Sequence, residues 1–126
     1  MCFDTTKRQR KSIAEEDIIC WKTGYLLYHP AMFMPSYRHD FDYLPNITQE
    51  IVRLRKTKRV YGSGLIEFVI TKGYHSYTTK EHAQLARASD EDIGMFIIPR
   101  GTAYYHNKED KEYVSETIIW TGVIIK

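Results

Sequence analysis

The feature that most constrains this chain is its final third, where short β-branched and aromatic runs alternate with polar or glycine-containing turns. Thr78, followed three residues later by Glu81, fits a capping box and predicts one helix over residues 79–88. The short runs predict strands over residues 94–98, 103–107, 112–114 and 117–125. This pattern predicts an α+β fold, mainly antiparallel β-sheet with one principal helix.

The earlier part of the chain adds further strands. β-branched and aromatic runs predict them over residues 17–21, 25–29, 47–55 and 65–71. A hairpin about Thr23 and Gly24 would join the first two. The third run also keeps helical spacing, and we favour a strand. Residues 30–46 hold three prolines among aromatic residues and predict an irregular loop.

Size and composition bound the class of protein. A chain of 126 residues with 43% hydrophobic content can bury one core, so residues 1–126 predict a single domain. Residues 1–14 carry several cations and few apolar side chains, which predicts a mobile basic arm. The apolar runs are shorter than a membrane span, and the two cysteines lack CxxC spacing. We therefore expect a soluble cytoplasmic protein with no membrane partner.

One run of the sequence is strongly basic. Its five cations are Arg53, Arg55, Lys56, Lys58 and Arg59. Such a run can hold phosphate groups, and nearby tyrosines such as Tyr61 would add base stacking, as in proteins that bind single-stranded nucleic acid. The alternative is a solvated loop or an edge strand protected by its charge. The formal net charge of +2 does not indicate nucleic-acid binding by itself.

A second candidate site is a cleft expected where residues 73–79 meet residues 99–105. The expected ligand-binding residues there, besides Lys22, are His75, Ser76, Thr78, Arg100, Tyr104 and Tyr105. The start of the helix would attract an anion, Arg100 would pair a phosphate, and one tyrosine would stack on a base. The alternative is that Arg100 belongs to a plain turn and one tyrosine to the core. The histidines lack metal-ligand spacing, so no metal site is expected.

Four stretches carry a resemblance to known sequences. They are residues 17–22, 73–77, 98–105 and 114–115. Together they resemble small uncharacterised proteins of gut Bacteroidetes and their phages. The resemblance implies a phage or mobile-element origin and brings no known activity.

The same skeleton more distantly resembles the mono-ADP-ribosyltransferase fold. The resemblance puts Lys22 at the position of the arginine that ends the first strand. It puts Ser76 or Thr78 in the Ser-Thr-Ser strand and Glu116 near the catalytic glutamate. A lysine, however, does not make the planar bidentate contact that arginine makes to a pyrophosphate.

Two further departures concern the same motifs. Tyr77 interrupts the hydroxyl motif, and Val114 stands where the family has an acidic residue or glutamine. The resemblance therefore implies a degenerate core without transferase activity. We expect a small non-catalytic binding protein, without a cofactor, that recognises a nucleotide-like anionic ligand or a host protein. The alternative is an ADP-ribosyltransferase-like enzyme that uses NAD and Glu116.

Overall fold

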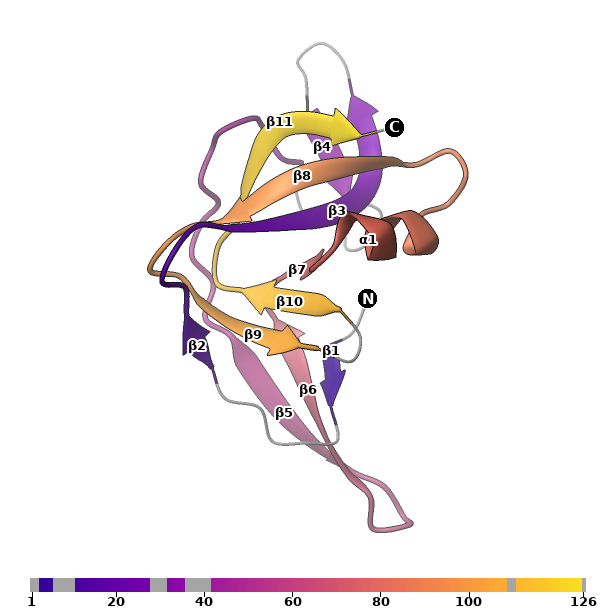
Figure 1. Ribbon diagram of the computed structural model, residues 1–126. Helices are drawn as coiled ribbons and strands as arrows, with labels where there is room; N and C mark the ends of the chain where they lie inside the picture. The colour runs from indigo at the N-terminus through magenta and orange to yellow at the C-terminus, as the bar shows by residue number, and fades with distance from the viewer. Residues whose placement is uncertain (1–2, 6–10, 28–31, 36–41, 109–110, 126) are drawn as a thin grey trace.

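Antiparallel strands dominate the fold, and one short helix accompanies them in the described part of the chain (Figure 1). The computed structural model describes residues 3–5, 11–27, 32–35, 42–108 and 111–125, and it describes the backbone alone at residues 3–5, 56, 59, 67–69 and 71. The elements are β1 (Phe3–Thr5), β2 (Ser12–Ile13), β3 (Ile18–Leu27), β4 (Met32–Pro35), β5 (Arg55–Val60), β6 (Ile66–Lys72), β7 (Tyr74–Tyr77), α1 (Lys80–Ala86), β8 (Asp92–Ile98), β9 (Ala103–Asn107), β10 (Glu112–Ser115) and β11 (Ile119–Ile125). The α+β class is confirmed. No helix among these residues is long and apolar enough to cross a membrane.

The described strands form two sheets. The smaller sheet has three strands in the order β1-β6-β5. The strands of the larger sheet pair in the order β11-β8-β3-β7-β10-β9-β2, and β4 pairs with β3 outside this order. Gly73 is the one residue between β6 in the first sheet and β7 in the second. Its φ of 140° is a backbone conformation that glycine adopts readily and other residues adopt rarely. A Cβ added at this position would clash with Val114 Cγ1 and lie 2.6 Å from Leu54 Cδ2. The chain therefore changes sheets within one residue.

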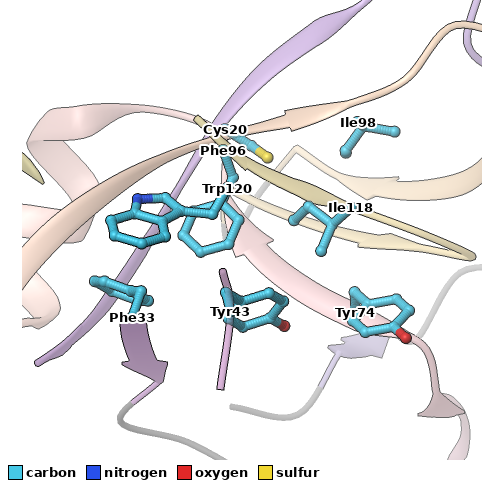
Figure 2. Close-up of a cluster of buried hydrophobic side chains, with 8 residues drawn as sticks. All are labelled: Cys20, Phe33, Tyr43, Tyr74, Phe96, Ile98, Ile118 and Trp120. Atoms are coloured by element: carbon cyan, nitrogen blue, oxygen red, sulfur yellow. The ribbon is translucent and has the colours of Figure 1, made fainter. Parts of the chain in front are cut away.

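The main core is rich in aromatic side chains. Its buried members are Cys20, Phe33, Tyr43, Tyr74, Phe96, Ile98, Ile118 and Trp120 (Figure 2). Phe96 makes edge contacts with Phe33 and Tyr43, at ring-centre distances of 5.3 and 4.9 Å. Such pairs add about 0.5–1.5 kcal/mol beyond the area they bury. Two of the ten tyrosines of this chain, Tyr43 and Tyr74, therefore belong to this core.

A smaller apolar cluster joins the two sheets. Ile70 of β6 packs with Tyr105 of β9 and Val114 of β10, and Leu54 covers them. Strand β1 pairs with β6 and also contacts β10. These contacts attach the three-stranded sheet to the rest of the protein.

The hairpin predicted about Thr23 and Gly24 is wrong, because β3 continues through both residues. Gly24 pairs with Pro35 of β4. A Cβ at Gly24 would clash with the Met34 carbonyl oxygen and lie 2.9 Å from Phe33 Cζ. This glycine therefore allows β4 to approach closely, and it makes no turn. Strand β4 also lies inside the segment predicted to be irregular.

Within residues 1–14, the segment predicted to be a mobile basic arm, the structure describes paired backbone. Residues 3–5 pair with β6, residues 12–13 pair with β9, and Ala14 is buried. The arm cations Lys7, Arg8 and Arg10 lie outside the described residues. The strands that pair with residues 3–5 and 12–13 are far away in the sequence, and a composition argument does not detect such pairing.

The strand predicted over residues 47–55 is also wrong, because regular pairing begins only at Arg55. Before it, the chain follows β11 and its preceding turn through separate backbone bonds. The amides of Asn46, Gln49 and Val52 donate to the carbonyls of Trp120, Ile118 and Glu116, at 2.7, 3.1 and 2.9 Å. Donors spaced three residues apart satisfy the backbone without forming a ladder.

Helix α1 begins one residue later than expected. Its N-cap is Thr79, whose extended backbone lets Oγ1 accept from the His82 amide at 3.1 Å. The capping box predicted at Thr78 is therefore wrong. The amide of Thr78 donates instead to the Lys111 carbonyl at 2.9 Å, which keeps Thr78 with the sheet.

The two neighbouring threonines give a matched pair of substitutions. We expect Thr79→Ala to lower the free energy of unfolding by about 1 kcal/mol, because the His82 amide loses its acceptor. Thr78→Ala keeps its backbone bond and should change stability less. Urea denaturation of both variants measures the difference, and equal losses would contradict the assignment of Thr79 as the cap.

Candidate functional site

Three of the expected ligand-binding residues meet below the surface, between β3 and β7. The Lys22 ammonium donates to the backbone carbonyl of His75, and Ser76 lies beside Cys20. Lys22 Nζ also lies 5.6 Å from the centre of the Tyr43 ring and 5.9 Å from that of Phe96. Both distances suit a cation–π contact. We call Cys20, Lys22, His75 and Ser76 the buried lysine cluster.

Burial dominates the acid–base properties of this cluster. It lowers the pKa of Lys22 from 10.5 to about 8 and raises the pKa of Cys20 from 9.0 to about 12. The neighbouring Ser76 hydroxyl and the Lys22 charge oppose the rise in the pKa of Cys20 without overcoming it. Ser76 Oγ is buried and has no hydrogen-bond partner within the described residues. The cluster therefore holds a neutral thiol next to an amine that loses its proton easily.

The surrounding protein covers these side chains. Lys22 is 9% exposed and Ser76 is fully buried, so a pyrophosphate does not reach them in this conformation. Tyr113 pairs with Ser76, and Glu116 lies three residues further along the chain. Three residues of extended chain span about 10 Å. The buried Lys22 and Ser76 therefore do not line a surface cleft with Glu116.

The other expected ligand residues lie elsewhere. Tyr104 lines an open groove of about 670 Å³, formed with Ser12, Ile13, Glu15, Glu16, Asp17 and Ile18. Asp17 accepts the Arg100 amide at 2.9 Å, so Arg100 stands at the entrance of a turn fixed by a carboxylate. Three acidic side chains line this groove, and their charge disfavours an anionic ligand. Tyr105 is buried between the sheets, which confirms the alternative that one tyrosine belongs to the core.

Strand β10 separates the two halves of the expected cleft. Its Tyr113 pairs with Ser76 on one side and with His106 on the other. Two strand spacings correspond to about 10 Å between β7 and β9. Ser76 therefore lies about two strand spacings from β9, the strand that carries Tyr104, so the two residues do not line one cleft. No group of three or more possible metal-binding side chains occurs within the described residues.

The basic run lies on a different part of the molecule, the hairpin formed by β5 and β6. This hairpin extends away from the rest of the protein (Figure 1). Arg53 precedes it, and Arg55 and Lys58 stand on β5, all three with exposed side chains. Lys56 and Arg59 complete the run, and their side chains lie outside the described part of the structure. The run therefore begins at the base of the hairpin, where Arg55 pairs with Lys72, and continues along β5 toward its far end.

The far end of this hairpin is a tight three-residue loop. The Tyr61 amide donates to the Leu65 carbonyl and the Gly64 amide to the Tyr61 carbonyl, both at 2.9 Å. Gly64 has a φ of 88°, the left-handed conformation that such loops require at this position. Val60 pairs with Ile66 directly behind the loop.

Four large apolar side chains are exposed at this end. They are Val60, Tyr61, Leu65 and Ile66, between 39% and 64% exposed, and we call them the hairpin tip. The strands predicted over residues 47–55 and 65–71 leave residues 62–64 without an assigned turn. The apolar pairs on both sides of those residues were the signal for a hairpin with an apolar end.

No protein-family model, curated protein or solved structure matches this chain.

Proposed function

We propose that this chain is a non-catalytic binding protein whose β5–β6 hairpin holds a nucleotide-like polyanion, namely a single strand of nucleic acid. The observation that carries the proposal is that the basic run follows β5 from its base, along a hairpin that extends from the body of the protein (Figure 1). Cations on a projecting arm can contact the backbone of a polymer at several points. Cations on a flat surface would contact it at fewer points. The contact is electrostatic and does not need a preformed pocket.

The spread of the cations favours a polymer over a small nucleotide. The six residues of β5 span about 20 Å, and exposed cations stand before, at the start of and within this strand. A mononucleotide would meet only part of such a surface, whereas a strand with repeated phosphates meets all of it. Strand β5 is also the edge of its sheet, so the same charges discourage pairing with another copy.

The test is the salt dependence of binding to a mixed-sequence single-stranded oligonucleotide. For single strands the logarithm of affinity falls with the logarithm of salt concentration by about 0.7 per phosphate neutralised. We expect the combined variant Arg53→Ala, Arg55→Ala and Lys58→Ala to reduce that slope by about 2. Fluorescence anisotropy across a salt series measures it.

A matched control removes the same charge elsewhere. Lys11, Arg100 and Lys108 are exposed and lie outside the hairpin, so their combined replacement by alanine changes the net charge equally. This control should keep the slope of the wild-type protein. Equal effects of the two triple variants would assign binding to net charge and contradict the hairpin as the site. Absence of oligonucleotide binding at low salt would contradict the function itself.

A further inference from the structure

We propose that the hairpin tip stacks on unpaired bases, so that the hairpin binds the bases of a strand as well as its phosphates. This inference rests on the proposed function and adds the part of the ligand that the tip contacts. The starting observation is that the end of the arm farthest from the body is apolar, while the stem behind it is basic. Exposed apolar side chains gathered beside cations mark a surface for a ligand that is both apolar and anionic.

The geometry of the loop holds the tip side chains in place. Tyr61 and Leu65 face each other across the loop through the bond between the Tyr61 amide and the Leu65 carbonyl. Val60 and Ile66 form the next cross-strand pair. Both strands of the hairpin are therefore paired up to the loop, and the tip is presented on an ordered ladder.

The chemistry of the tip fits unpaired bases. A tyrosine ring offers a flat face with little rotational freedom, and each base has a face on which it can stack. Lys58 lies two residues before Val60, so the alternation of the strand places the two on one face of the hairpin. A phosphate held near Lys58 leaves the attached base within reach of the apolar end. Single-stranded nucleic acid offers such bases, whereas paired bases in a duplex are already stacked.

An abasic strand of equal length separates the two parts of the contact, because it keeps the phosphates and lacks the bases. We expect the wild-type protein to bind the normal strand about tenfold more tightly than the abasic strand at the same salt concentration. Tyr61→Ser should remove this preference and leave the affinity for the abasic strand unchanged. Tyr61→Phe should retain the preference, since the ring is kept.

Leu85→Ser is the matched control, because Leu85 is an exposed apolar residue on α1, away from the hairpin. It should behave as the wild-type protein, and urea denaturation checks that each variant folds. Equal wild-type affinity for the two strands, with the salt slope intact, would overturn the stacking role and leave the proposed function standing. Binding to neither strand would overturn both. Tyr61-dependent binding to phosphatidylserine vesicles, without discrimination between the strands, would assign the tip to a bilayer and overturn the inference.

Discussion

In the wild-type protein, Lys22 is expected to raise the free energy of unfolding as the pH increases from 8 to 10.5. The substitution Lys22→Met should abolish this rise. The folded protein holds the pKa of Lys22 at about 8, below its ordinary value of 10.5. Between these values the unfolded chain binds one more proton than the folded chain, so stability increases with pH. The full increase is about 3 kcal/mol, because each pKa unit corresponds to about 1.4 kcal/mol. Below pH 8 both states are protonated and the contribution is constant.

Cys20 acts in the opposite direction and must be separated. Its pKa is raised from 9.0 to about 12, so between these values the folded protein holds the extra proton and stability decreases with pH. The measurement is therefore made in a Cys20→Ala background, by urea denaturation from pH 7 to 10.5 with and without Lys22→Met. Tyr74 and Tyr113, whose pKa values burial raises, titrate in both proteins and cancel in the difference. Parallel stability curves would show that the amine keeps its ordinary pKa.

Gly73→Ala is expected to lower the free energy of unfolding by about 3 kcal/mol or more. Two effects add at this position. Its φ of 140° is strained for any residue with a Cβ, and the new methyl group would press on the side chains of Val114 and Leu54. Both neighbours belong to the apolar cluster that joins the two sheets, so the loss of packing should be largest where the hairpin meets the body.

Two other glycines separate these effects. Gly101 has a φ of 87° with open space around its Cβ position, so Gly101→Ala tests backbone strain alone, about 1 kcal/mol. Gly62 has open space and no positive φ, and Gly62→Ala should be close to neutral. Thermal and urea denaturation of the three variants give the order. A loss at Gly73 no larger than that at Gly101 would mean that the junction between the sheets adjusts easily.

The strands of the second half of the chain were predictable because their signal is local. Residues 103–107 form β9 with the predicted bounds, and β6, β8, β10 and β11 differ from their predicted ranges by two residues or fewer at each end. Alternating side chains and turn residues fix such strands without knowledge of their partners. The helix was also predicted, but with a start one residue too early. The reason is that Thr78 and Thr79 both carry a hydroxyl that can cap a helix. The Lys111 carbonyl, which binds the Thr78 amide, decides between them.

The differences from the predictions arise from contacts between segments, which local composition does not reveal. Glycine is common in turns, so Gly24 suggests a turn. The structure shows instead that β4 approaches this residue too closely for a side chain. Residues 3–5 and 12–13 pair with strands that begin about sixty or more residues later. For the candidate site, the resemblance selected Lys22 and Ser76, which do lie close together. Their burial depends on rings from β8 and from residue 43, which sequence spacing does not reveal.

The regular ladder between residues 56–60 of β5 and residues 66–70 of β6 makes the reach of the arm an adjustable length. Beyond the body, each cross-strand pair adds about 3.3 Å, and successive pairs point to opposite faces. Deleting two neighbouring pairs would draw the tip inward by about 7 Å and leave every remaining side chain on its present face. Deleting one pair would turn Tyr61 to the other side relative to the body. A series of shortened arms would therefore measure how far from the body its ligand lies.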